Sequence, residues 1–245
     1  MIGVIAGREL RSALVSPLPW ILLGGAQVVL AWIFLKVVDD FTGLGADERV
    51  ASLTVELALN LFGFAAVILM LAVPLMAMRM LSGEFRDGSF ELVASAPVRI
   101  AELVAGKFLA LTLLMTPLCL LPVLNIALLA GSAELDPGQM AAATLGLWLV
   151  GTMFCAVGLY ASSLSAQTGA SVIAAFTILL VFSVIGRVET LGAHDLSLFG
   201  WLSWNEHLFW FLLGAVRLSD LVYLLGFTGL FLALTHRRLA NRVLQ

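Results

Sequence analysis

The chain has 245 residues, of which 61% are hydrophobic and 12% charged, about half the charged share of a soluble domain. Its long apolar stretches lack the polar faces at 3.6-residue spacing that a water-soluble helical bundle needs, and the net charge of −3 gives no sign of a nucleic-acid partner. We therefore expect an all-α membrane protein with a single transmembrane domain over residues 1–245.

The first stretch, 1–16, is expected to form an amphipathic helix that lies in the membrane interface. Its apolar residues share one broad side and Arg8 and Arg11 lie on the other, although Glu9 borders the apolar side. Pro17 ends this helix, because proline cannot continue the backbone hydrogen bonds of the preceding turns. A plain cytoplasmic tail is the alternative. We expect no cleavable signal peptide, because the basic residues follow the first apolar ones.

Six apolar stretches follow, each close to the roughly 20 residues that a helix needs to cross a bilayer. The fifth is short, and Asp220 lies near the start of the sixth. We place the transmembrane helices at about 18–38, 57–80, 108–130, 140–162, 169–186 and 218–235.

The basic residues between these helices predict their orientation, since Lys and Arg accumulate on the cytoplasmic side. With six spans both termini share one side, which holds nine of the 13 basic residues: Arg8, Arg11, Arg79, Arg86, Arg99, Lys107, Arg237, Arg238 and Arg242. The other side holds four: Lys36, Arg49, Arg187 and Arg217. Both termini are therefore expected in the cytoplasm.

The fourth span carries small residues on one helix face. Gly151, Cys155, Gly158 and Ser162 follow one another at steps of four, three and four. Such a face lets helices approach closely in lipid, either within the chain or against a second chain. Cys155 and Cys119 are expected to be buried thiols rather than a disulfide or a metal pair.

Other residues inside the spans leave function open. Pro74, Pro117 and Pro122 can kink their helices, as in moving transporters but also in static bundles. Gln27 and Asn125 fit interhelical hydrogen bonds as well as a substrate path. No acidic or basic residue is expected in the middle of a span, which argues against ion-coupled transport.

The longest inner loop carries eight charged residues between Arg79 and Lys107. Gly88 followed by Ser89 predicts a turn and then a helix start. Residues 89–95 mix apolar and charged side chains, which suits a short helix that lies along the membrane and docks a soluble partner. An ordinary loop would give the same pattern.

Together with the six spans and the cytoplasmic start, this loop resembles the permease subunit of an ABC-2 type ABC transporter. The family's pattern is an acidic residue, a Gly-Thr-x-Glu-x-Leu-like step, a Pro and a Gly-Lys pair that opens the third span. The matching residues are Met78, Arg79, Glu84, Gly88, Ser89 (where Thr is more usual), Phe90, Glu91, Leu92, Pro97, Gly106 and Lys107. With the stretches 158–165, 214–217 and 220–223, the chain looks most similar to the gliding-motility-associated permeases of that family.

The resemblance implies that a separate cytoplasmic ATPase subunit grips a coupling helix in the inner loop. Closure of two such ATPase subunits would tilt the spans, and two permease chains, identical or related, would enclose the pathway. A larger accessory subunit is a further implied partner. The residues implied at the ATPase contact are Glu84, Phe85, Arg86, Asp87, Gly88, Phe90, Glu91 and Leu92.

The chain itself is not expected to be an enzyme. Gly106-Lys107 lacks the first Gly and the following Ser or Thr of a phosphate-binding loop, so ATP and Mg are expected in the partner ATPase. No catalytic, cofactor or metal residue is predicted. An intramembrane protease or transferase is disfavoured, because His194, His207 and His236 all fall in loops or at span ends.

The outer segment 199–213 is rich in Trp and too short and polar to span. It is expected to be a re-entrant or interfacial helix, with Trp204, Glu206 and His207 as an outer gate. A metal site that adds His194 and Asp195 matches no known ligand spacing.

The chain is therefore expected to be an export permease driven by a partner ATPase, in lipid contact within the bacterial inner membrane. The alternative is a subunit of the same fold that transmits ATP-driven force to periplasmic or membrane partners without moving a substrate. No residue identifies the substrate.

Overall fold

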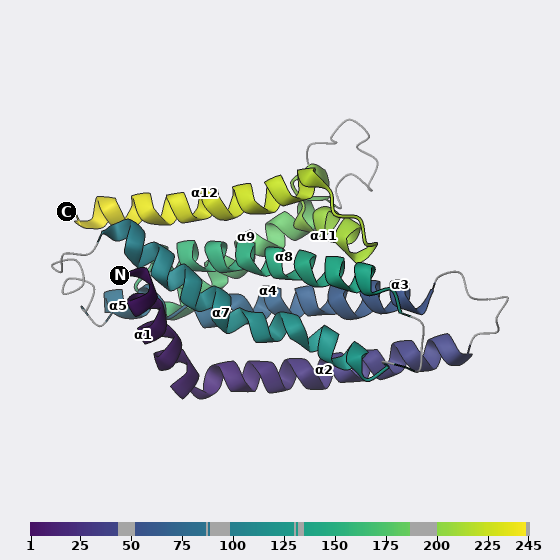
Figure 1. The fold of residues 1–245 in the computed structure, drawn as a ribbon. Coiled ribbons are helices and arrows are strands. Elements are labelled where there is room, and N and C mark those ends of the chain that lie inside the picture. The colour runs from purple at the N-terminus through teal and green to yellow at the C-terminus, as the bar shows by residue number, and fades with distance from the viewer. Residues whose placement is uncertain are drawn as a thin grey trace.

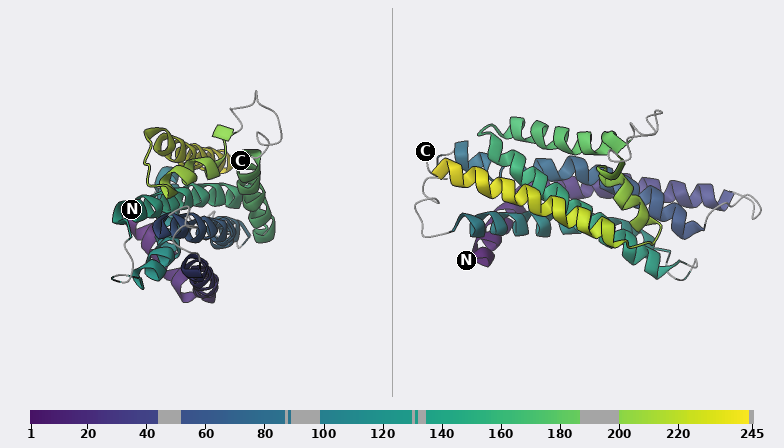
Figure 2. Two further views of the ribbon diagram at one scale, coloured as in Figure 1. Left: turned by 90° about the vertical axis from the view of Figure 1, so that its right-hand side faces the viewer. Right: turned by 90° about the horizontal axis from the view of Figure 1, so that it is seen from above.

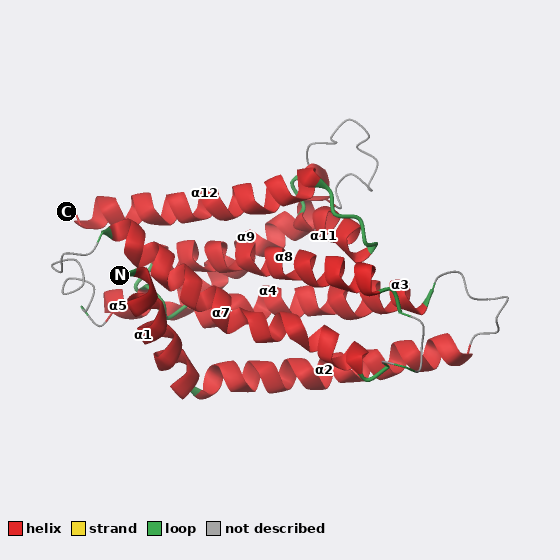
Figure 3. Ribbon diagram, in the orientation of Figure 1, coloured by secondary structure: helices red, strands yellow, loops and turns green. Residues whose placement is uncertain are grey.

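The computed structural model describes residues 1–43, 52–86, 88, 99–129, 131, 135–186 and 200–243. Within these residues all regular structure is helical (Figure 3). The long helices run side by side, and the two chain termini lie at the same end of the bundle (Figures 1 and 2). We call this the termini end and the opposite one the far end.

Helix α1 (Ile2–Val15) and the first long helix, α2 (Pro17–Gly43), meet at a sharp corner (Figure 1). Pro17 lacks the N–H that would continue α1, yet it suits the first position of a new helix. The indole of Trp20 donates to the carbonyl of Leu14 at 2.9 Å and braces this corner. The predicted N-terminal helix and its break are confirmed; its place in the membrane interface stays a prediction.

The second long helix is continuous from α3 (Leu53–Leu57) through a π-helical turn, η2 (Ala58–Phe62), to α4 (Gly63–Ala77). Ser52 caps its start by accepting an N–H of the first turn. A tight turn then leads to the short helix α5 (Ser82–Arg86) at the termini end.

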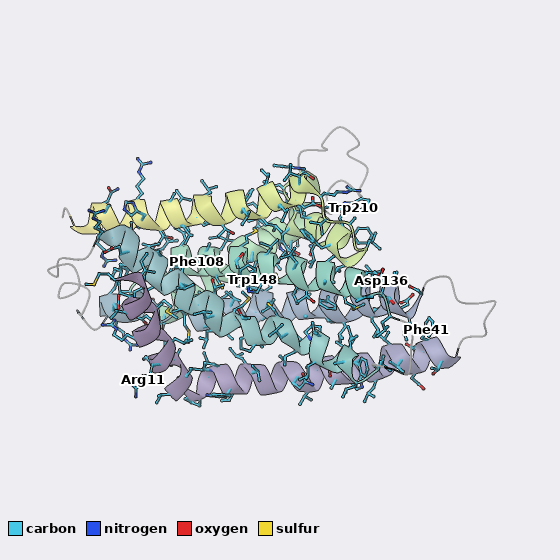
Figure 4. The ribbon with its side chains drawn as sticks, viewed as in Figure 1. Arg11, Phe41, Phe108, Asp136, Trp148 and Trp210 are labelled. Carbon is cyan, nitrogen blue, oxygen red and sulfur yellow. The ribbon has the colours of Figure 1, made fainter. Side chains whose placement is uncertain are left out.

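Helices α7 (Ile100–Ala127) and α8 (Pro137–Leu164) form the next antiparallel pair. Helix α7 begins directly after Arg99, and Pro137 and Gly138 lie in the first turn of α8. Asp136 caps that helix by accepting the N–H of Gly138 at 2.8 Å, and it lies at the far end (Figure 4).

The C-terminal part comprises α9 (Thr168–Val184), the short α11 (Trp204–Leu212) at the far end and α12 (Leu218–Val243), which returns to the termini end (Figures 1 and 2). Both α9 and α12 pack against α8.

Five helices of the described chain are long and apolar enough to cross a membrane: Pro17–Gly43, Leu53–Arg86, Ile100–Ala127, Pro137–Leu164 and Leu218–Arg242. The predicted span 169–186 coincides with α9, which has 17 residues. At 1.5 Å per residue it is about 25 Å long, a little short of the ~30 Å hydrocarbon layer. The sixth crossing therefore stays a prediction.

Helix α8 forms the centre of the bundle, and its small residues receive neighbours from within the chain. A Cβ on Gly158 would stand 2.8 Å from the Cβ of Ala77 in α4. Gly151 lies against Met115 and Cys119 of α7, where a side chain would clash. The small-residue face thus packs inside this chain. Both thiols are free and buried, as expected.

Two polar contacts tie helices together inside the apolar core. Gln27 of α2 donates to the amide oxygen of Asn125 of α7 at 3.0 Å, and Asn125 donates back at 3.4 Å. Trp148 of α8 donates to the hydroxyl of Thr116 of α7 at 3.2 Å. Since the side-chain amides of Gln27 and Asn125 hydrogen-bond to each other, they link α2 to α7.

Candidate functional site

A buried lysine organises the termini end. The side chain of Lys107 is 1% exposed, and its ammonium donates to Glu84 Oε1 at 2.8 Å, Glu9 Oε1 at 3.0 Å and the Met80 carbonyl at 2.7 Å. These three acceptors match the three N–H bonds of an ammonium group. Arg8 also pairs with Glu9 at 3.0 Å and, at the longer distance of 3.4 Å, with Glu84. We call Arg8, Glu9, Glu84 and Lys107 the Lys107 cluster.

The Lys107 cluster joins three separate elements at one point. Its carboxylates come from α1 and α5 and its buried cation from α7. Two cations balance two carboxylates. Because removal of one buried partner would leave another charge without compensation, the three elements are expected to hold one another firmly.

Gly106, the residue before Lys107, allows α1 to approach α7 closely enough for this cluster to form. A Cβ on Gly106 would stand 2.8 Å from Cγ2 of Ile5 and 3.2 Å from the carbonyl of Ile2, so only glycine lets α1 lie directly on α7. That close approach carries Glu9 to Lys107. The Gly106-Lys107 pair therefore has a physical explanation as a docking point for α1.

Two further contacts hold α5 in place. The hydroxyl of Ser162, at the end of α8, accepts the N–H groups of Leu81 and Ser82, both at 3.1 Å. The guanidinium of Arg242, near the end of α12, lies 3.9 Å from the ring centre of Phe85. Helix α5 is thus linked to α8 and α12 as well as to α1 and α7.

A second polar cluster is buried at the far end, where α11 meets α12. His207 Nδ1 lies 2.7 Å from Asp220 Oδ1, and both side chains are 4% exposed. His207 Nε2 lies 2.9 Å from the carbonyl of Trp201. The ring of Tyr223 stacks on the imidazole at 3.8 Å, and its hydroxyl donates to the carbonyl of Leu202 at 2.6 Å. We call Trp201, His207, Asp220 and Tyr223 the His207 cluster.

The hydrogen bonds of His207 fix how many protons the pair holds. A backbone carbonyl only accepts, so Nε2 must carry a proton. The short contact between Nδ1 and Oδ1 requires a second proton, carried either by an imidazolium facing a carboxylate or by a carboxylic acid facing a neutral ring. The pair as a whole is neutral in both forms. The other oxygen of Asp220, Oδ2, is buried without a hydrogen-bond partner.

Other contacts fasten α11 to the centre of the bundle. Gln139, in the first turn of α8, donates to the carbonyl of Leu212 at 2.8 Å. The ring of Trp204 meets that of Phe154 edge-on at 5.1 Å, and its indole N–H faces the carbonyl of Leu179 at 3.4 Å. Helix α11 is therefore an integral part of the far end rather than a loose appendage.

Comparison with protein families gives a match over residues 4–199 to the model of the ABC-2 family transporter protein. The chain belongs to the ABC-2 transporter family. This matched range contains the Lys107 cluster and every span before α12. No curated protein matches the chain.

Membership of the ABC-2 family makes this chain a membrane permease component of an ABC transporter, and it implies association with a cytoplasmic ABC ATPase. With its apolar helices, the chain is a multi-pass integral membrane protein. The family's membrane component is not itself the ATPase. The likeness to the gliding-motility-associated subgroup stays a prediction, since the family match carries no subgroup.

The predicted ATPase-contact residues are only partly within the described chain. Glu84, Phe85 and Arg86 form the second half of α5, and Gly88 follows with a φ of 68°, the left-handed backbone of a turn. The carboxylate of Glu84 points into the Lys107 cluster, Phe85 is half-buried and Arg86 is exposed. The remaining residues, Asp87, Phe90, Glu91 and Leu92, lie outside the described residues.

The predicted outer-gate residues have different environments. Trp204 and His207 are buried, whereas Glu206 in the same helix is exposed. His194 and Asp195, which the disfavoured metal site would require, lie outside the described residues. In the part of the chain that the structure describes, no group of three or more His, Cys, Asp or Glu side chains is placed to hold a metal ion.

Sequence reasoning did not find the two buried polar contacts, Lys107 with its carboxylates and His207 with Asp220. Lys107 was placed at the mouth of the third span, but α7 begins seven residues earlier, at Ile100, so Lys107 lies two turns inside a helix. Asp220 is visible in the sequence only as an acidic residue near the start of the sixth predicted span. For α1 the sequence did contain an indication. Glu9 borders the apolar side of this helix, and the structure explains its position by its ion pair with the buried Lys107.

Proposed function

We propose that this chain is an export permease in which ATP hydrolysis by separate cytoplasmic ATPase subunits moves the spans through the termini end. ATP and Mg bind to those subunits, and two permease chains, identical or related, enclose the pathway. Family membership supports a membrane component that works with an ABC ATPase. The excess of Lys and Arg at the termini end supports a cytoplasmic location for that end, in a bacterial inner membrane.

Helix α9 is proposed as the sixth crossing. Its 17 residues leave a small hydrophobic mismatch, which bilayers accommodate by thinning at modest cost. The link between α8 and α9 lies beside Arg238 and Arg242 of α12, at the termini end. The other end of α9 meets α11, where Asn205 donates to the hydroxyl of Ser183 at 2.8 Å and to its carbonyl at 3.1 Å.

One observation carries the proposal: the short helix α5, in which the predicted ATPase-contact segment begins, has contacts to four other helices. Glu84 meets Lys107 of α7 and Arg8 of α1, Ser162 of α8 holds the turn before α5, and Arg242 of α12 covers Phe85. A push on this segment from the cytoplasm would therefore reach most of the bundle through short polar contacts. We propose that α5 transmits the ATPase stroke in this way.

The proposal divides the predicted contact residues into two roles. Glu84 positions α5 from inside, since its carboxylate is engaged with Lys107. Phe85, Arg86 and Gly88, with the residues Asp87, Phe90, Glu91 and Leu92 of the following segment, meet the ATPase. Apolar side chains at such a surface anchor the contact, and rim charges select the partner.

Charge reversal in the predicted contact segment tests this. The double variant Asp87→Lys/Glu91→Lys should lose co-purification of the ATPase and ATP-driven transport, because it reverses two rim charges. A matched control is Asp39→Lys/Asp40→Lys near the far end of α2, which makes the same charge change away from the contact. Unchanged ATPase recruitment by the first variant would show that the docking assignment is wrong.

A force-transmitting subunit is the second candidate function. The resemblance to gliding-motility-associated permeases favours it, and the same links from α5 would serve it, with a larger accessory subunit as the recipient. Sealed vesicles that contain the whole complex separate the two: ATP-dependent substrate movement supports the permease, and ATP hydrolysis without movement supports force transmission. In the permease, Trp204, Glu206 and His207 are proposed to close the outer end of the pathway.

A further inference from the structure

A pocket of about 150 Å³ lies under the corner between α1 and α2. Its floor is apolar and comes from Leu75 and Met76 of α4, Met80 in the turn after α4 and Leu114 of α7. Its rim is polar and comes from Glu9 and Ser12 of α1, Ser16 directly after α1 and Arg79 in the turn after α4. A hollow that is polar at its mouth and apolar at its base fits an amphipathic ligand rather than an ion or a sugar.

Among the charged side chains around this pocket, one cation, that of Arg79, is not neutralised by a carboxylate of the described residues. Glu9 lines the rim, but its carboxylate is paired with Lys107 and Arg8, which also compensate Glu84. Arg79 is exposed and makes no ion pair within the described residues. The rim therefore carries a net positive charge that an anionic group can neutralise.

An apolar track leads away from the pocket into the membrane. Leu71 and Val67 continue the line of Leu75 at steps of four residues along α4, and they are 50% and 46% exposed. Residues four apart share a helix face, so the track is continuous. An acyl chain that lies on it would cover apolar side chains that the described part of the chain leaves about half exposed.

We propose that this pocket binds the headgroup of an anionic phospholipid. Arg79 takes the phosphate, the hydroxyl of Ser12 adds a hydrogen bond, and an acyl chain lies along Leu75, Leu71 and Val67. Basic pockets between membrane helices at headgroup depth commonly hold such lipids. The site lies beside the Lys107 cluster, so a bound lipid would brace the corner that sets the position of α1. It requires only that the chain spans a bilayer and is independent of which side the termini face.

The test compares lipids on the whole purified chain. Native mass spectrometry after exchange into mixed micelles should retain phosphatidylglycerol in preference to phosphatidylcholine. Arg79→Gln should reduce that preference about fivefold, the effect of one basic residue near an anionic headgroup. Arg11→Gln is the matched control, because Arg11 has the same charge at the same end but does not line this pocket. Equal loss in both variants would overturn the specific site.

A second measurement uses the unaltered chain, so that it does not depend on the folding of a variant. A photoreactive phosphatidylglycerol should label the peptide that contains residues 67–80, and excess phosphatidylglycerol should suppress that label. Inorganic phosphate or glycerol phosphate should not suppress it, since neither occupies the apolar floor. Suppression by the soluble phosphates, or labelling spread evenly over all helices, would contradict a lipid site.

Discussion

Lys107 and Glu84 lie 23 residues apart in the chain, and their side chains meet at 2.8 Å in a buried ion pair. The pair joins α7, two turns after its start, to α5, which contains the first three residues of the predicted ATPase contact. Since Glu9 and the carbonyl of Met80 complete the coordination of the ammonium, Lys107 has no donor to spare.

Replacement of Lys107 by methionine should destabilise the protein by about 3–5 kcal/mol, because two carboxylates would lose their buried cation. Thermal unfolding in detergent, followed by tryptophan fluorescence, measures this. Lys36→Met is the control, since Lys36 is the chain's other lysine and is exposed. The triple variant Lys107→Met/Glu9→Gln/Glu84→Gln should recover much of the loss. No recovery would mean that the loss in Lys107→Met does not come from carboxylates left without their cation, and would contradict the role of the buried charges.

The apolar lengths of the sequence were enough to predict the bundle, because crossing lipid fixes helix length and composition. The ionic contacts could not be predicted in the same way. Lys107 and Glu9 are 98 residues apart, and nothing in either local pattern names its partner. The Gly106-Lys107 pair was visible as a motif, but its reason depends on the approach of Ile5 from another helix.

The far end shows the same limit. The sequence places Asp220 near the start of the sixth predicted span and His207 in the predicted outer gate, and neither pattern indicates that the two are partners. Only the packing of α11 against α12 brings their side chains to 2.7 Å. The small-residue face of α8 marks the intermediate case: the pattern predicted close packing, but the identity of its neighbours, Ala77 and Met115, came from the fold.

Ser162 offers a direct test of the link between α8 and α5. Ser162→Ala removes the acceptor of two buried N–H groups, those of Leu81 and Ser82, and should cost about 1–3 kcal/mol. Ser163→Ala is a close control, because that hydroxyl is equally buried but bonds only to Tyr160 of its own helix. Chemical denaturation in mixed micelles compares the two. Equal losses of stability in the two variants would show that the contact of Ser162 with α5 contributes no more than an ordinary bond within α8.

Gly106 should tolerate no side chain. Gly106→Ala places a methyl group against Ile5 and the carbonyl of Ile2, and such overpacking costs about 1–3 kcal/mol. Gly24→Ala in α2 meets nothing within 4 Å and should be neutral or stabilising by up to about 1 kcal/mol, through better helix propensity. Limited proteolysis reports the position of α1: the first variant should release N-terminal fragments sooner. Equal protection of both variants would show that α1 does not depend on this close approach.

The two-proton state of the His207–Asp220 pair predicts unequal effects at residue 220. Asp220→Asn can donate from its amide to Nδ1 of a neutral His207, so it should change stability by no more than about 1 kcal/mol. Asp220→Ala leaves Nδ1 unpaired and opens a void, and should cost about 2–4 kcal/mol. Thermal unfolding measures both. A loss for Asp220→Asn as large as that for Asp220→Ala would mean that the pair must be ionic.

The number of crossings can be decided with two single cysteines. Ala166, between α8 and α9, is exposed at the termini end, and Val216, between α11 and α12, is exposed at the far end. The native Cys119 and Cys155 are buried, so an impermeant maleimide should leave the unaltered chain almost unlabelled. We expect Ala166→Cys to react only from the cytoplasmic side and Val216→Cys only from the outside. If α9 lay in one leaflet without crossing, both positions would react from the same side. The reverse pattern, with Ala166→Cys labelled from outside, would preserve six crossings but place α5 and the Lys107 cluster out of reach of any cytoplasmic ATPase.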